Sequence, residues 1–308
     1  MTDRHSLKKY AWLSIGAAIA TIALKSVAYA LTGSVGLLSD AIESLVNLVG
    51  ATVALAMLTV AAQPPDDEHH WGHDKAEYFA SGVEGALIVA AAISIAIASV
   101  SRLIHPQPIE KVGLGLLVST LASAINFVVA RKLFDVGKRF DSITLEADAR
   151  HLMTDVWTSV GVIGGVGLVV LTGWTRLDPI VALLVAANIV YTGGRLVQRS
   201  VLGLLDTALA TTEGEAVERI LASYRAQGLE FHAVRSRQAA ARRFVTMHVL
   251  VPGEWTVLRG HELLERIERE IVGSVPNCSV LTHLEPIEDP VSFDDIDLDR
   301  KPPRRIAE

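Results

Sequence analysis

Residues 10–31 read YAWLSIGAAIATIALKSVAYAL, an apolar run that contains a single charged residue, Lys25. A helix needs about 20 apolar residues to cross a bilayer, so this run is long enough to span one. A secretory signal has a shorter apolar stretch and a small-residue cleavage site. We therefore predict that these residues form a first transmembrane helix and not a cleaved leader.

Five further runs of spanning length follow, and all are rich in Ala, Val, Leu, Ile and Gly. They cover residues 35–62, 78–100, 112–130, 152–172 and 178–196. Hydrophobic residues make up 50% of the 308, and the charged residues gather after about residue 200. Small residues at this density favour close helix packing in lipid. The pattern predicts a six-helix transmembrane domain over residues 1–205.

Basic residues flank these runs unevenly, which predicts the orientation of the chain. One side of the bilayer receives Arg4, Lys8, Lys9, Arg131, Lys132, Lys138, Arg139, Arg150, Arg195 and Arg199. The other side receives Arg102, Lys111 and Arg176. Because short cytoplasmic segments carry an excess of Lys and Arg, we expect a multi-pass protein of the cell (inner) membrane with both termini in the cytoplasm.

The sequence after residue 205 changes to patterns that are typical of a small α+β domain. We expect an α-β-β-α-β order over residues 206–289. The expected elements are a helix over 211–227, strands over 230–237 and 243–251 joined by a loop over 238–242, an amphipathic helix over 256–275 and a strand over 278–284.

The last residues, 290–308, are acidic and then basic, and we predict a disordered tail. Its aspartates, Asp294, Asp295, Asp297 and Asp299, vaguely resemble a calcium loop. The glycine and the twelfth-position glutamate of an EF-hand are absent, which favours a solvated tail.

Composition argues against nucleic-acid binding and against cysteine-based sites. The net charge of −6 argues against a nucleic-acid partner, which needs a basic face. Cys278 is the single cysteine, so the chain has no intrachain disulfide and no thiolate cluster for a metal. Any metal site must use His, Asp and Glu.

Charged and polar residues inside the apolar runs are candidate functional groups, because a charge within a bilayer is costly. The second run contains Asp40, Glu43 and Asn47 on one helix face, and the fifth run begins with His151 and Asp155 at i, i+4 spacing. If the two helices face each other, Glu43, Asn47, His151 and Asp155 form a four-ligand site that suits zinc. For Lys25 and Glu84 we expect packing, pairing or snorkelling.

Two more groups of possible ligands lie outside the apolar runs. Asp66, His69 and His73 share the loop between the second and third runs. His232, His248, His261 and His283, with Glu285 beside the last, fall on three expected strands and one helix. Those histidines can converge only through folding. His261-Glu262 resembles the start of the zinc-protease motif H-E-x-x-H, but the second histidine is missing, which argues against a protease.

These residues resemble the cation diffusion facilitator (cation efflux) family. The resemblance rests on residues 38–47 (LSDAIESLVN), residues 65–77 (PDDEHHWGHDKAE), His151-x-x-x-Asp155, Asp178-Pro179 and the histidines of the last domain. It covers about residues 10–286. The element Gly-His-x-Lys-Ala-Glu together with His-x-x-x-Asp is specific.

The resemblance implies a homodimer that exchanges cytoplasmic divalent metal for external protons by alternating access. It implies metal ligation by Glu43, Asn47, His151 and Asp155 in the membrane and by Asp66, His69 and His73 in the loop. It further implies a binuclear site in a ferredoxin-like cytoplasmic domain, formed by His232, His248, His261, His283 and Glu285. Lys75 and Asp206 correspond to an interlocking charge pair near a hinge.

The sequence departs from the family pattern in the second run. Glu43 and Asn47 stand where the family usually has two Asp, or His and Asp. Asp40 is therefore an alternative to Asn47 as the remaining ligand. Glu285 stands where an Asp is often found.

We thus predict a transporter and not an enzyme, with the divalent metal as substrate and as structural ligand. Zinc is the leading metal, and iron(II), manganese(II), cobalt(II) and cadmium are alternatives. A membrane metal sensor without flux is an alternative function.

Overall fold

The computed structural model describes residues 7–32, 35–105, 112–174 and 176–298. Within these ranges the side chains of residues 32, 35–43, 112–116, 162, 165–167, 169–170 and 178 lie outside the description. The chain divides into two compact units that meet between Leu204 and Leu205. Each unit is described by itself.

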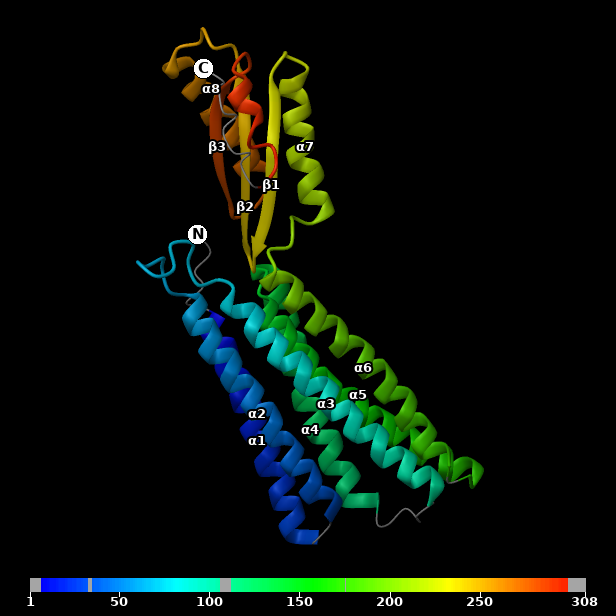
Figure 1. Cartoon of the computed structure of the whole chain (residues 1–308). Helices are drawn as coiled ribbons and strands as arrows, with labels where there is room; N and C mark the ends of the chain where they lie inside the picture. The colour runs from blue at the N-terminus through cyan, green and yellow to red at the C-terminus, as the bar shows by residue number, and fades with distance from the viewer. Residues whose placement is uncertain (1–6, 33–34, 106–111, 175, 299–308) are drawn as a thin grey trace, which may run out of the picture. The chain divides into compact units, whose positions relative to one another are not determined.

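The first unit is a bundle of six long helices (Figure 1). They are α1 (Lys8–Thr32), α2 (Val35–Ala61), α3 (Ala76–Ile104), α4 (Val112–Phe140), α5 (Ile143–Thr172) and α6 (Leu177–Leu204). Among the described residues, all except α5 carry stretches long and apolar enough to cross a membrane. The N-terminal half of α5 carries Glu146, Asp148, Arg150, His151 and Asp155. The prediction of an α-helical membrane domain is confirmed.

Small residues let α3 and α6 approach closely. A Cβ atom added to Gly85 of α3 would lie 3.0 Å from the backbone nitrogen of Val197 in α6. One added to Gly193 of α6 would lie 2.8 Å from Cγ2 of Ile88 in α3. Packing of this kind drives helix association where the surroundings are as apolar as the side chains.

Helix α5 begins at Ile143, well before the apolar run that predicted it. The reason is a cap from α3. The fully buried Glu77 carboxylate accepts a hydrogen bond from the Ser142 hydroxyl and one from the backbone nitrogen of Thr144, at 3.3 Å. A carboxylate at a helix N-terminus satisfies free N–H groups and complements the helix dipole. The polar first turns of α5 are therefore helical although they are not apolar.

The second unit has the predicted α-β-β-α-β order. Its elements are α7 (Thr211–Arg225), β1 (Glu230–Ala239), β2 (Arg242–Val251), α8 (Val257–Ser274) and β3 (Cys278–Pro286), followed by the 3-10 helix η2 (Pro290–Phe293). The strand order is β1-β2-β3, with β1 antiparallel and β3 parallel to β2. The α+β fold prediction is confirmed.

One face of this sheet carries the core of the unit. Alternate residues of β2, from Val245 through Met247 to Val249, pack with Leu221 of α7 and Ile267 of α8. Both helices therefore cover the same face (Figure 1). Because side chains alternate across a strand, the residues between these positions, His248 among them, lie on the other face.

The predicted loop over residues 238–242 is much shorter in the structure. The strands extend to Ala239 and from Arg242, so that Ala240 and Ala241 alone join them, and Ala240 adopts a φ of 51°. Tight hairpins normally place Gly or Asn where φ is positive. Because this turn is made of alanines, the sequence gives no such signal.

Residues 290–298 contain ordered structure, whereas the sequence predicted a disordered tail from residue 290. The Asp289 carboxylate caps η2 by accepting a hydrogen bond from the backbone nitrogen of Val291 at 2.9 Å. Pro290 is the first residue of this helix. The hydroxyl of the buried Ser292 donates to the Pro286 carbonyl at 2.8 Å. These contacts hold the segment against the end of β3.

Candidate metal-binding sites

The register of the sheet places three of the predicted histidines in a row. His232 of β1 lies opposite His248 of β2, and His248 lies opposite His283 of β3. Residues paired across strands project from the same face, so the three imidazoles share the face that α7 and α8 do not cover. Glu285 lies two residues after His283 and so projects from the same face.

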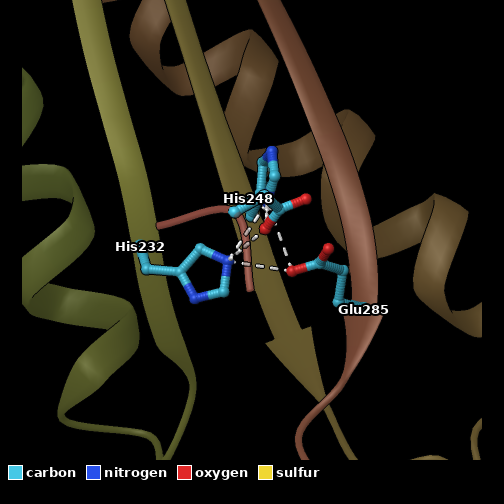
Figure 2. Close-up of side chains that lie close together, drawn as sticks. His232, His248 and Glu285 are labelled. Carbon is cyan, nitrogen blue, oxygen red and sulfur yellow. Dashed lines mark hydrogen bonds and ion pairs between the residues drawn. The ribbon is translucent and has the colours of Figure 1, made fainter. Parts of the chain in front are cut away.

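Three of these side chains converge closely, and we call His232, His248 and Glu285 the sheet site (Figure 2). Nε2 of His232 lies 2.9 Å from Oε2 of Glu285, and Nδ1 of His248 lies 3.2 Å from the same oxygen. The two ring nitrogens are 3.1 Å apart. The Glu285 side chain is 8% exposed, so this carboxylate faces imidazoles and not solvent.

The structure adds a residue to this group that the sequence did not single out as a ligand. Asp295 places a carboxylate oxygen so that one atom each from His232, His248, Glu285 and Asp295 lie within 4.8 Å of one another. Ten residues separate Asp295 from Glu285 in the sequence, and no spacing rule links them. Only the fold of the C-terminal segment brings them together.

The remaining predicted residues of this domain lie farther out. His283 is 66% exposed, and its Nε2 lies 3.6 Å from Oε1 of Glu285, at the edge of the sheet site. His261 is exposed on α8, which packs against the opposite face of the sheet through Leu263 and Ile267. Within one chain the structure does not bring His261 to the sheet site.

A second group, the loop site, consists of Asp66, His69 and His73 between α2 and α3. Asp66 carboxylate oxygens lie 3.1 Å from Nδ1 of His69 and 3.4 Å from Nε2 of His73. The same carboxylate accepts hydrogen bonds from the backbone nitrogens of Glu68, at 3.1 Å, and His69, at 2.7 Å. This side-chain-to-backbone turn holds the carboxylate toward both imidazoles.

These contacts also set the ionisation of the loop site. Desolvation opposes the charged form of Asp66, but the hydrogen bonds from His69 and Glu68 prevail and hold the pKa of its carboxyl below the ordinary value. Hydrogen bonds donated to a carboxylate favour its ionised form. Asp66 therefore presents a charged carboxylate at neutral pH.

Inside the helical bundle, the predicted residues of α2 and α5 meet. The Asn47 amide nitrogen of α2 donates to Oδ2 of Asp155 in α5, and the Asn126 amide nitrogen of α4 donates to the same oxygen at 3.0 Å. His151, one helical turn before Asp155, is 4% exposed. We call Asn47, His151 and Asp155 the helical site. The side chains of Asp40 and Glu43, on the same helix as Asn47, lie outside the description.

His151 is held by a residue of α3. Its Nδ1 lies 2.5 Å from Oε2 of Glu84, which is fully buried. Glu84 fits against α2 because residue 50 is a glycine, and a Cβ atom there would collide with the Glu84 carboxylate. From the sequence we predicted packing, pairing or snorkelling for Glu84, and the structure shows a pairing with His151. The i, i+4 pattern on α5 could not reveal which helix faces His151.

Lys75 and Asp206 fall in different units, and each has a partner within its own unit. The Lys75 ammonium donates to the Leu204 carbonyl at 3.3 Å, and the Asp206 carboxylate accepts from the Arg237 guanidinium at 3.2 Å. A charge pair between Lys75 and Asp206 stays a prediction.

The donor chemistry of all three sites is nitrogen and oxygen. Burial, with the Glu213 carboxylate nearby, raises the pKa of the Cys278 thiol to about 11, so this thiol is protonated at neutral pH. Imidazole and carboxylate ligands suit zinc and other first-row divalent ions.

The two units match known protein families separately. The cation efflux transmembrane domain matches residues 11–205, and the cytoplasmic domain of cation efflux proteins matches residues 209–287. Together these matches cover most of the chain.

Whole-chain relatives agree with these matches. A protein of Synechocystis sp., named an uncharacterized transporter, is 50% identical over 293 residues, which are 95% of this chain and 94% of the relative. The cation-efflux pump FieF of Salmonella arizonae is 29% identical over 270 residues, 87% of this chain and 89% of the pump. The FieF pump of Klebsiella pneumoniae is 27% identical over 270 residues, with the same coverage. The chain belongs to the cation diffusion facilitator, or cation efflux, family of membrane transporters.

Proposed function

We propose that this protein exports divalent metal ions from the cytoplasm, with zinc as the main substrate, in exchange for protons and by alternating access. The observation that carries the proposal is the helical site. It places the imidazole of His151, the carboxylate of Asp155 and the carboxamide of Asn47 inside a bundle of apolar helices. Ionisable groups at such depth are costly and mark ion pathways.

Metal and protons compete for the same atoms of the helical site. A metal ion binds the neutral imidazole of His151 and the ionised carboxylate of Asp155, so its binding releases protons. Glu43 would complete the set of ligands, and Asp40 is an alternative to Asn47. When the site opens to the cytoplasm it binds metal, and when it opens to the outside protons displace the metal.

The other two sites support this transport. We propose that the loop site of Asp66, His69 and His73 offers a first contact for the metal. The sheet site, with His283 at its edge, holds metal that stabilises a homodimer of the cytoplasmic domain. Buried oxygen and nitrogen atoms without hydrogen-bond partners among the described residues, Oε2 of Glu285 and Nδ1 of His232, fit such a role. His261 is exposed on α8, which packs against the other face of the sheet, so it is not part of the proposed site.

The proposed topology follows the sequence. We propose a transmembrane domain over residues 1–205 and a cytoplasmic domain over 206–289, with both termini in the cytoplasm of a cell that exports metal through its inner membrane. The relatives are named as a transporter and as cation-efflux pumps, which supports export without naming the metal. Iron(II), manganese(II), cobalt(II) and cadmium accept the same donor atoms and are alternative substrates.

The test is zinc flux into proteoliposomes under an imposed proton gradient, with internal pH recorded at the same time. We expect zinc and protons to move in opposite directions in the wild type. Flux that ignores the gradient and moves no protons contradicts the exchange. If manganese or iron is transported and zinc is not, the protein is a transporter with a different substrate. If no metal is transported, the result favours a sensor.

A further inference from the structure

The C-terminal segment of residues 290–298, which we call the strap, begins by folding back on β3. The Ser292 hydroxyl bonds to the Pro286 carbonyl at 2.8 Å, and the backbone nitrogen of Asp289 donates to the same carbonyl at 3.3 Å. This reversal turns the chain toward the sheet face that the helices leave uncovered. The strap begins after residue 287, where the match to the family's cytoplasmic domain ends.

Two contacts from β1 hold the strap on that face. The Phe293 ring packs edge-on against the imidazole of His232, with 5.9 Å between ring centres. The Arg235 guanidinium donates hydrogen bonds to the backbone carbonyls of Ile296, at 3.0 Å, and of Asp297. Both contacts anchor backbone or ring atoms and leave the carboxylate between them free to point at the sheet.

That carboxylate belongs to Asp295 and points at the sheet site. Its Oδ1 lies 3.4 Å from Nδ1 of His248 and 3.9 Å from Nε2 of His232. Oδ1 of Asp295 and Oε2 of Glu285 are both buried and lack a hydrogen-bond partner among the described residues. Two carboxylate oxygens buried beside two imidazoles are an expensive arrangement unless a positive charge lies among them.

We propose that Asp295 is a metal ligand, so that the strap completes the sheet site and metal binding fastens the strap to the sheet. The inference rests on the metal site proposed for His232, His248 and Glu285. With Asp295, two neutral imidazoles and two carboxylates give four ligands and cancel the charge of a divalent ion, the arrangement zinc prefers. Without Asp295 the three remaining ligands leave one positive charge and an open position.

Metal binding fastens the strap to the sheet through thermodynamic linkage. An ion that binds the docked strap more tightly than the free strap shifts the strap toward the docked form by the ratio of the two affinities. The strap thus reports whether the cytoplasmic domain holds metal.

The experiment is hydrogen–deuterium exchange of the full chain in detergent during a zinc titration, with amides of β2 as the readout of site occupancy and those of residues 291–298 as the readout of the strap. In the wild type zinc should slow exchange in both. Asp295→Asn should weaken zinc binding at the sheet at least about tenfold and abolish protection of the strap at saturating zinc.

Asp297→Asn is the matched control, because it removes the same charge two residues away from an exposed side chain. It should behave as the wild type. If Asp295→Asn keeps both the zinc affinity and the protected strap, Asp295 is not a ligand. A strap that is equally protected without zinc would also overturn the proposal, because the docking would then need no metal.

His232→Ala separates failure of this inference from failure of the underlying site. If His232→Ala loses zinc binding at the sheet while Asp295→Asn does not, the sheet site stands and the strap plays no part in it. If zinc protects β2 equally in His232→Ala, the sheet site itself is wrong. Exchange of α7 and α8 without zinc verifies that each variant is folded.

Discussion

The helical site and the sheet site use similar side chains but differ in what those side chains contact. In the helical site each ionisable side chain contacts another protein group: Asp155 accepts from Asn47 and Asn126, and His151 pairs with Glu84. In the sheet site the side chains of His232, His248 and Glu285 face mainly one another.

This difference has a functional meaning. Where the donor atoms themselves already have protein partners, as Oδ2 of Asp155 and Nδ1 of His151 do, loss of a metal ion leaves these atoms paired, so release costs less free energy. Where ligands have only one another, release leaves buried atoms unsatisfied, and the ion is retained. The contacts therefore suit exchange in the bundle and retention on the sheet. Substitutions at each site can test this contrast, and the largest effect is expected in the bundle.

Replacing Asp155 by Ala should separate the two sites most sharply. We expect zinc flux in proteoliposomes to fall more than about 100-fold, because the carboxylate that both asparagines hold is lost from the helical site. Zinc protection of β2 should stay unchanged. Asp135→Ala, which removes an exposed carboxylate from α4, is the control. Flux that survives Asp155→Ala would place the transport path elsewhere.

Glu84 tests whether the partners of the helical site matter. Replacing it by Gln removes the charge that holds Nδ1 of His151, and residues that orient a ligand in this way typically contribute about 10- to 100-fold. We expect flux to fall in that range. Because a Cβ atom at residue 50 would collide with the Glu84 carboxylate, Gly50→Ala should reproduce much of this loss.

The matched control for Gly50 is Gly16→Ala, where an added Cβ atom meets nothing within 4 Å. Equal flux in Gly50→Ala and Gly16→Ala would mean that the position of Glu84 is unimportant, and the contrast between the two sites would lose its basis.

On the sheet, His232 and His261 should behave differently although the sequence groups them. His232→Ala should lower zinc affinity at the sheet at least about tenfold, because its Nε2 lies beside Glu285. His261→Ala changes an exposed residue on the far side of the unit and should stay within about twofold. Isothermal titration of both variants measures the ratio, and an equal loss would indicate that His261 reaches the site from elsewhere.

The sequence predicted much of the fold because apolar length and alternation are local signals. Residues 10–31 identified α1 almost to its ends, and the pattern around Leu263 and Ile267 identified α8. The alanine hairpin at Ala240 and the cap that Glu77 gives to α5 were missed, because one lacks a turn residue and the other joins positions far apart in the chain.

The candidate sites follow the same rule. The spacing of Asp66, His69 and His73 is local, and the structure brings these residues together. The row from His232 through His248 to His283 depends on strand register, which no spacing reveals. Asp295 and the pairing of Glu84 with His151 depend on contacts between elements, so the sequence could list these residues but not connect them.

The loop site should show the smallest effect and so marks the lower end of the contrast. The side chains of Asp66 and His69 are both 52% exposed, and because solvent screens exposed ion pairs, losing one typically changes binding by about fivefold or less. We expect Asp66→Asn to lower zinc flux by no more than this, because Asn keeps an oxygen that accepts from the backbone of Glu68 and His69. Asp66→Ala removes that oxygen too and should lower flux further.

The pH dependence of this variant gives a second check. A carboxyl whose pKa is lowered on folding stabilises the folded protein at pH values above its ordinary pKa of about 3.9. This stabilisation is lost as the pH falls through the lower pKa of the folded state. Asp66 therefore stays ionised throughout transport assays between pH 6 and 8. The ratio of Asp66→Asn to wild-type flux, measured at saturating zinc, should be the same at both ends of that range. A ratio that approaches one at pH 6 would mean that Asp66 takes up a proton during transport and would move it from metal capture to proton coupling.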